Sequence, residues 1–357
     1  MGLEGELRVH VWLRDGRITR VQLQSTRPDV AATLLQGRSP QELTTAVPRL
    51  FAICGASQGV ACRLALAGAA GQPPDAAMLS SCSAEVTAEI VRESSRRALL
   101  DAPRHLGERP SDAAVQAARI AMQWPRSSPD APSTLALAIF GMPADEWMAL
   151  DTPAALAGWV SAGHTATARE LQRLADDDCC GQPVALLPPT PPGHVPDWLP
   201  EPGNDPGFAH RPLWCGRPAE TGALTRLQAD PLVAALLRAA AGRVRVRHLA
   251  RLRELAQLLG GAQPLRAGVL DAAAGAGIAW VEGPRGLLVH QIRLTAGRAQ
   301  AYRIVAPTEW NFHPEGAVPM ALQGAPVADA ADARHRAERL INSLDPCVTC
   351  QVEAVDA

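Results

Sequence analysis

The chain has 357 residues, enough for one large domain or two. Its 34 basic and 36 acidic residues leave a formal net charge of -2, so charge gives no case for binding nucleic acid or a membrane surface. Eight cysteines without a secretory signal indicate a reducing compartment, with thiols that pack or bind metal. The sequence also contains no apolar run of about 18 residues, so we expect a cytoplasmic protein without a membrane helix.

The predicted elements are mixed, with more helix than strand. Alternating apolar residues predict a hairpin over 7–23 that turns at Asp15-Gly16, and a second over 287–305 that turns at Ala296-Gly297. Apolar residues at helical spacing predict helices over 58–70, 77–100, 112–123, 165–177, 231–259 and 330–343. The helix over 231–259 is expected to begin at its proline and to stop at the following Gly-Gly pair. The Pro- and Gly-rich stretch 181–207 predicts a loop or extended linker.

Two cysteines close to the C-terminus are the first candidates for a functional site. Cys347 and Cys350 lie three residues apart behind Pro346, and thiolates at this spacing can converge on one metal ion. The proline ring is expected to hold Asp345 in an extended conformation and so to pre-form part of the turn. A further sulfur comes from residues 54–57, Cys-Gly-Ala-Ser, which read as a Cys-x-x-Cys pair whose second sulfur has become a hydroxyl.

Together these two segments resemble the nickel–iron hydrogenase large subunits, which carry an N-terminal C-G-x-C and a C-terminal D-P-C-x-x-C. Further segments resemble blocks of that family in the family's order: residues 3–9, 35–40, 210–226, 282–290, 307–311 and 324–329. One block would be a weak signal, whereas the ordered set spans nearly the whole chain. The resemblance implies a single truncated large-subunit-like domain over 1–357. Its expected fold is α+β, mainly helical, with a hydrogenase-large-subunit-like helical core and β-hairpins in the N-terminal part and the C-terminal half.

The chain departs from this family at the metal centre. The resemblance implies three metal ligands, with the last at a bridging position: Cys54, Cys347 and Cys350. Ser57 stands at the other bridging position, and its hard hydroxyl cannot replace a soft thiolate bridge. Ala32 and Glu353 stand where the family has the glutamate and the histidine that bind magnesium. We therefore expect neither nickel nor magnesium to bind as they do in the family.

The positions that surround the iron ligands in the family are kept. Arg285 stands where a guanidinium donates to an iron-bound cyanide, and Thr308 where a hydroxyl and a backbone N–H hold a second one. The same resemblance places Pro284, Pro307 and Asp345 in this pocket. The pattern resembles the large-subunit-like hydrogenase assembly proteins of the HupK/HoxV type. It implies a non-catalytic scaffold that transiently carries an Fe(CN)2CO unit, received from iron-delivering maturation chaperones, for a hydrogenase large-subunit precursor.

Other interpretations stay open from the residues alone. The chain could be a nickel-dependent hydrogenase-like enzyme, although Ser57 in place of a bridging cysteine argues against this. It could also be a metal-free mimic of the large subunit that recruits accessory proteins. A terminal Cys-x-x-Cys by itself is typical of zinc or redox sites. Arg285 is also explained as a buried ion-pair partner of Asp345, and His290 as a strand histidine whose ring is satisfied by the backbone.

Overall fold

The computed structural model describes residues 5–26, 34–51, 53–174, 182–188, 199–200, 205, 207–239, 242–270 and 272–356. The chain divides into two units, each compact in itself. Unit 1 comprises Met1–Val86, Cys179–Thr225 and Leu265–Ala357, and unit 2 comprises Thr87–Asp178 and Arg226–Pro264. Every candidate site residue that the structure describes belongs to unit 1. The expectation of a single domain over the whole chain stays a prediction.

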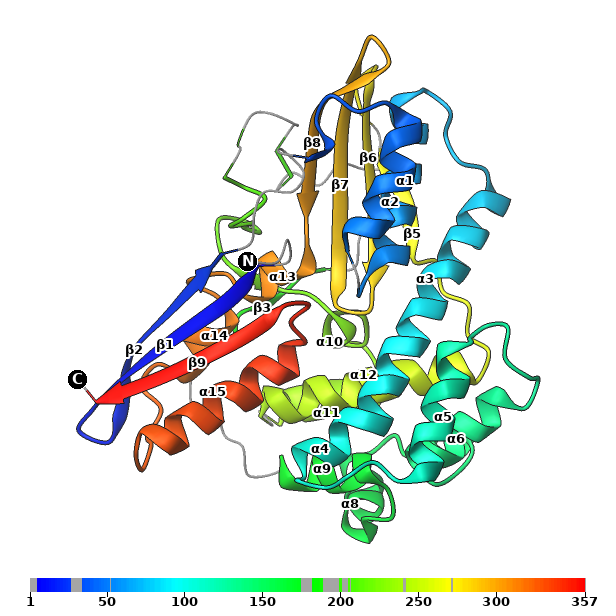
Figure 1. Cartoon of the computed structure of the whole chain (residues 1–357). Coiled ribbons are helices and arrows are strands. Elements are labelled where there is room, and N and C mark those ends of the chain that lie inside the picture. The colour runs from blue at the N-terminus through cyan, green and yellow to red at the C-terminus, as the bar shows by residue number, and fades with distance from the viewer. Residues whose placement is uncertain are drawn as a thin grey trace. The chain divides into compact units, whose positions relative to one another are not determined.

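The first predicted hairpin is confirmed, and the C-terminus joins it. Strands β1 (Glu6–Arg14) and β2 (Arg17–Ser25) are antiparallel around Asp15 and Gly16, whose φ angles of 52° and 69° suit an Asp-Gly turn. Strand β9 (Thr349–Asp356) pairs with β1 in parallel, giving the order β2-β1-β9. Helix α15 (Ala330–Leu344) runs beside this sheet (Figure 1). The pairing fixes the terminal segment, because Cys350 lies opposite Leu7.

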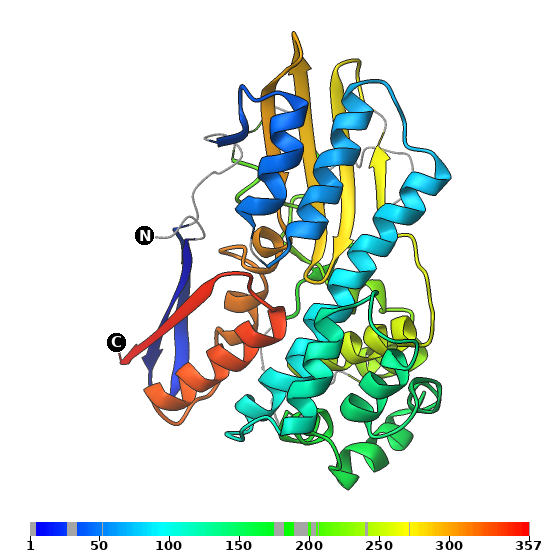
Figure 2. The same ribbon diagram turned by 45° about the vertical axis from the view of Figure 1, so that its right-hand side comes forward.

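A four-stranded antiparallel sheet carries the second predicted hairpin, which is also confirmed. Its order is β5 (Ala267–Leu270), β6 (Ala276–Gly283), β7 (Gly286–Thr295) and β8 (Arg298–Val305). Helix α2 (Gly55–Ala69) packs on this sheet with α1 (Pro40–Leu50) beside it, as Figures 1 and 2 both show. The approach is close: a Cβ at Gly277 would lie 1.8 Å from the carbonyl oxygen of Ala65. Only glycine lets strand and helix meet there.

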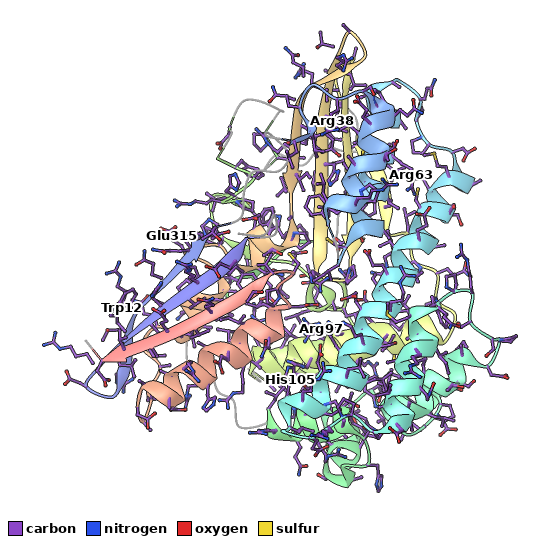
Figure 3. The ribbon with its side chains drawn as sticks, in the orientation of Figure 1. Trp12, Arg38, Arg63, Arg97, His105 and Glu315 are labelled. Atoms are coloured by element: carbon purple, nitrogen blue, oxygen red, sulfur yellow. The ribbon has the colours of Figure 1, made fainter. Side chains whose placement is uncertain are left out.

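The remaining elements of unit 1 are short, apart from the start of one long helix. They are α3 (Ala76–Arg96, whose second half belongs to unit 2), β3 (Ala185–Leu186), β4 (Ala219–Glu220), α10 (Ala223–Arg226, ending at the unit boundary), α13 (Pro307–Asn311) and α14 (Ala317–Leu322). Figure 3 labels Arg63 on α2, whose Nη2 lies 2.8 Å from Oε1 of Glu85 on α3. This half-exposed ion pair joins the two helices beside the sheet.

Unit 2 consists of helices in its described residues. They are a π-helical turn (Arg97–Asp101), α4 (Ala102–His105), α5 (Asp112–Met122), α6 (Ala131–Phe140), α7 (Ala144–Met148), α8 (Pro153–Ala162), α9 (Ala166–Arg173), α11 (Pro231–Arg238) and α12 (Arg243–Leu259). Polar side chains meet inside it: Nδ1 of His105, labelled in Figure 3, lies 2.7 Å from Oε1 of the buried Glu170. Burial opposes ionisation of Glu170, but His248 and His105 outweigh it and hold the pKa of this carboxyl below its usual value.

The predicted helices over 58–70, 77–100, 112–123, 165–177 and 330–343 are confirmed, with small shifts at their described ends. Residues 175–177 of the fourth lie outside the described residues. The single helix predicted over 231–259 begins at Pro231 and stops at Gly260 as expected, but its continuity is wrong, because α11 ends at Arg238 and Gly242 caps a new helix, α12. Most of 181–207 lies outside the described residues, and its described part contains the short strand β3. The α+β, mainly helical fold class is confirmed. Within the described ranges, no helix is both long and apolar enough to cross a bilayer.

Candidate functional site

Pro284 and Arg285 form the two-residue turn between β6 and β7. The Asn311 side chain supports this turn through two hydrogen bonds. Asn311 donates from Nδ2 to the carbonyl oxygen of Arg285 over 3.4 Å, and it accepts from the backbone N–H of Thr221 over 2.9 Å. The next residue, Gly286, has a φ of +123°, and a Cβ there would lie 2.5 Å from Oγ1 of Thr221. The turn therefore requires glycine, and it places a buried arginine at the end of the sheet.

The Arg285 side chain reaches the C-terminal segment. Its Nε lies 3.3 Å from Oδ1 of Asp345, and each side chain is only 5% exposed. The extended conformation expected for Asp345 is wrong, because this residue ends helix α15 in the left-handed region, with φ 58° and ψ 65°. Its N–H donates to the carbonyl of Asn342 over 3.3 Å, as in a helix C-cap. The alternative explanation of Arg285 as an ion-pair partner is thus confirmed. Its partner Asp345 precedes Cys347 by two residues.

The two terminal cysteines lie on different elements. Cys347 lies in the bend after α15, whereas Cys350 lies in strand β9. Thr308 follows Pro307 in the first turn of α13, and its Oγ1 is 3.1 Å from Sγ of Cys347. Burial, and secondly the neighbouring Cys347, raises the pKa of Cys350 to about 12. Cys350 therefore carries a proton at neutral pH in the metal-free chain, and metal binding there would release that proton.

The N-terminal cysteine segment is positioned by close backbone packing. Cys54 is the N-cap of α2, and a Cβ at the following Gly55 would lie 2.6 Å from the carbonyl oxygen of Pro48 in α1. Ser57 is buried in the first turn of α2. A Cβ at Gly283 would lie 2.8 Å from its Oγ, so the hydroxyl faces the strand end that leads into the Arg285 turn. Ser57 is therefore beside the turn whose arginine the sequence assigned to the site.

Behind Cys54 lies a buried row of polar side chains that the sequence did not predict. Gln58 donates from Nε2 to Sγ of Cys54 over 3.8 Å. Its Oε1 lies 2.8 Å from Nε2 of His290, whose Nδ1 lies 2.8 Å from the hydroxyl of Tyr302. The expectation that the backbone satisfies His290 is therefore wrong. Burial lowers the pKa of this histidine to about 3, so its ring is neutral at neutral pH. The four-residue spacing of Cys54 and Gln58 was the available signal.

The structure does not bring every predicted site residue together. Within the described part of the chain, no group of three or more His, Cys, Asp or Glu side chains is arranged to hold a metal ion. Metal ligation by Cys54, Cys347 and Cys350 stays a prediction. Of the two positions tied to magnesium, Ala32 lies outside the described residues. Glu353 lies on β9 with its side chain 67% exposed, and its Oε2 is 3.2 Å from Nδ1 of His10 on β1.

Known proteins resemble this chain in both sequence and fold. Residues 262–353 match the nickel-dependent hydrogenase family. The hydrogenase expression/formation protein HoxV of Cupriavidus necator is 32% identical, over 93% of this chain and 92% of that protein. The hydrogenase expression/formation protein HupK of Rhizobium leguminosarum bv. viciae is also 32% identical, over 99% of this chain and 98% of its own.

Among solved structures, the Ni-Fe-Se hydrogenase from Desulfovibrio vulgaris Hildenborough in the reduced state has a similar fold, with a TM-score of 0.60. The match covers 94% of this chain and 95% of that chain at 18% identity, so it bears on the fold alone. The expected hydrogenase-large-subunit-like fold is thereby confirmed. The identity to HoxV and HupK extends over nearly the whole chain, and the chain therefore belongs to the family of hydrogenase expression/formation proteins.

Proposed function

We propose that the chain is a non-catalytic scaffold of hydrogenase maturation that transiently holds an Fe(CN)2CO unit before its insertion into a nickel–iron hydrogenase large subunit. Its family supports the broader role in maturation. One observation carries the finer role. The buried guanidinium of Arg285 and the hydroxyl of Thr308 both contact the segment 345–350, which also supplies two sulfurs.

The chemistry of the cargo suits this small set of donors. An Fe(CN)2CO unit brings its own cyanide and carbonyl ligands, so it needs few further ligands from the protein. Thiolates are soft donors suited to iron, and we assign Cys350 as the principal one, assisted by Cys347 or Cys54. Iron-bound cyanides are anionic, and a buried guanidinium and a hydroxyl are the donors that stabilise such groups. Arg285 and Thr308 would serve the two cyanides, with Pro284, Pro307 and Asp345 around them.

The position of Ser57 supports transfer of the cargo and not turnover of hydrogen. Its hydroxyl stands where the hydrogenases have a bridging thiolate, and it is buried against the strand end at Gly283. With that sulfur absent, nickel is not expected to bind, and the iron unit is held by fewer soft ligands than a complete centre would provide. A weaker site lets the unit pass from iron-delivering chaperones through this chain to the large-subunit precursor.

Infrared spectroscopy tests the proposal directly, because bound CO and CN absorb where protein does not. The protein is purified anaerobically from its native host, and we expect CO and CN bands in the wild type. Cys350→Ala should abolish the bands and stop maturation, whereas Cys215→Ser, at an exposed cysteine, should retain both. Full bands in Cys350→Ala would contradict the ligand assignment. A wild type without bands that still supports maturation would favour the metal-free recruiter.

A further inference from the structure

Cys54 is contacted by a buried chain of polar side chains to which the proposed function gives no role. Gln58 follows Cys54 by four residues, so both lie on one face of α2, and its Nε2 lies 3.8 Å from the sulfur. Its Oε1 is 2.8 Å from Nε2 of His290, and Nδ1 of that ring is 2.8 Å from the hydroxyl of Tyr302.

The direction of donation along this row of hydrogen bonds follows from whether each atom can donate or accept. An amide oxygen only accepts, so the Gln58 oxygen requires the proton of His290 to be on Nε2. A neutral ring then has a lone pair on Nδ1, to which the Tyr302 hydroxyl donates. From Tyr302 to Gln58, each of the two hydrogen bonds of the His290 ring then joins one donor to one acceptor.

We propose that Gln58 is a positioning residue that presents an amide N–H to the sulfur of Cys54, and that His290 and Tyr302 hold it in this orientation. An exposed glutamine turns its amide freely. Here Gln58 is 2% exposed and His290 is 0% exposed, so turning the amide would oblige the ring and the tyrosine to exchange donors and acceptors as well.

The consequence for iron rests on the proposed function. An N–H that donates to a metal-bound thiolate takes up part of its negative charge and weakens its donation to the metal. Cys54 then binds an iron unit less strongly than a thiolate without this donor. The hydrogen bonds among these side chains need no metal, so they can be tested in the metal-free protein.

The first measurement is the tautomer of His290, read from nitrogen–proton correlation spectra of metal-free protein labelled with 15N-histidine. We expect the proton on Nε2 throughout pH 6–8. Gln58→Leu removes the acceptor and should abolish this preference, whereas Gln58→Glu has the same shape, still accepts from the ring, and should retain it. Gln323→Glu, at an exposed glutamine, is the matched control and should leave the ring signals unchanged. A proton on Nδ1 in the wild type would overturn the proposed direction.

The second measurement uses the iron-loaded protein and separates this inference from the proposed function. Both Gln58→Leu and Gln58→Glu remove the donor to the Cys54 sulfur, so each should move the CO band to lower wavenumber without removing it. Bands identical to those of the wild type would overturn the action of Gln58 on a metal-bound sulfur. If the wild type itself has no CO or CN bands, the proposed function fails. The tautomer measurement alone then decides whether the hydrogen-bonded row of Gln58, His290 and Tyr302 exists as described.

Discussion

The ion pair between Arg285 and Asp345 makes a quantitative prediction, because both side chains are 5% exposed and their charged atoms are 3.3 Å apart. At an effective dielectric constant of about 20, two unit charges at that separation attract by roughly 5 kcal/mol. Desolvation offsets part of this attraction, and removing one partner of a buried pair costs about 3–5 kcal/mol. We therefore expect Arg285→Met and Asp345→Asn each to destabilise the metal-free protein by about that amount. Asparagine is chosen because it tolerates the left-handed conformation at 345.

A double-mutant cycle isolates the interaction. Urea unfolding of wild type, both single variants and the double variant should give a coupling energy of about 2–3 kcal/mol, insensitive to salt because the pair is buried. The matched control is the i,i+4 pair Arg334 and Glu338, whose side chains are 57% and 42% exposed. Its coupling should be at most about 0.5 kcal/mol and should fall with salt. A coupling at Arg285–Asp345 no larger than at the control pair would refute the reasoning.

Four further outcomes are expected. Ser57→Cys should hold the iron unit longer and slow maturation, and unchanged retention and rate would show that the missing sulfur does not set release. Arg285→Lys keeps the charge but loses the fork of donors, so the CN bands should shift; unchanged CN frequencies would mean that the guanidinium points elsewhere. The pKa of His290 is lowered to about 3 in the folded protein. Below about pH 6.5 this histidine therefore binds a proton in the unfolded chain but stays neutral in the folded one. Stability should then fall by up to roughly 1.4 kcal/mol per pH unit, with a shallower slope in His290→Gln, and equal slopes in urea unfolding would contradict this. Gly277→Ala puts a Cβ 1.8 Å from a carbonyl oxygen of α2 and should destabilise the fold by about 3 kcal/mol, whereas Gly158→Ala, with open space around its Cβ, should not, as thermal unfolding would reveal.

Local patterns in the sequence predicted the elements whose signals are local. The hairpin at Asp15-Gly16 and that at Ala296-Gly297 follow from alternation and turn chemistry within a few residues. The ordered motif blocks led to the right family without any structural information. The possible ion pair between Arg285 and Asp345 was also accessible, because both residues lie in such blocks. The break between α11 and α12 was not accessible, because the apolar periodicity over 231–259 runs across it.

The tertiary structure decided how these segments meet. The left-handed Asp345 is set by the end of α15, which overrides the extended preference that a following proline imposes. The row from Cys54 to Tyr302 depends on a contact between Gln58 and His290, which are 232 residues apart in the chain. The support of the Arg285 turn by Thr221 and Asn311 is likewise a contact between distant segments. Such contacts leave no periodic trace in the sequence, because they are set by the packing of α2 against β6 and β7 and of α13 against β7, and not by the neighbours of each residue along the chain.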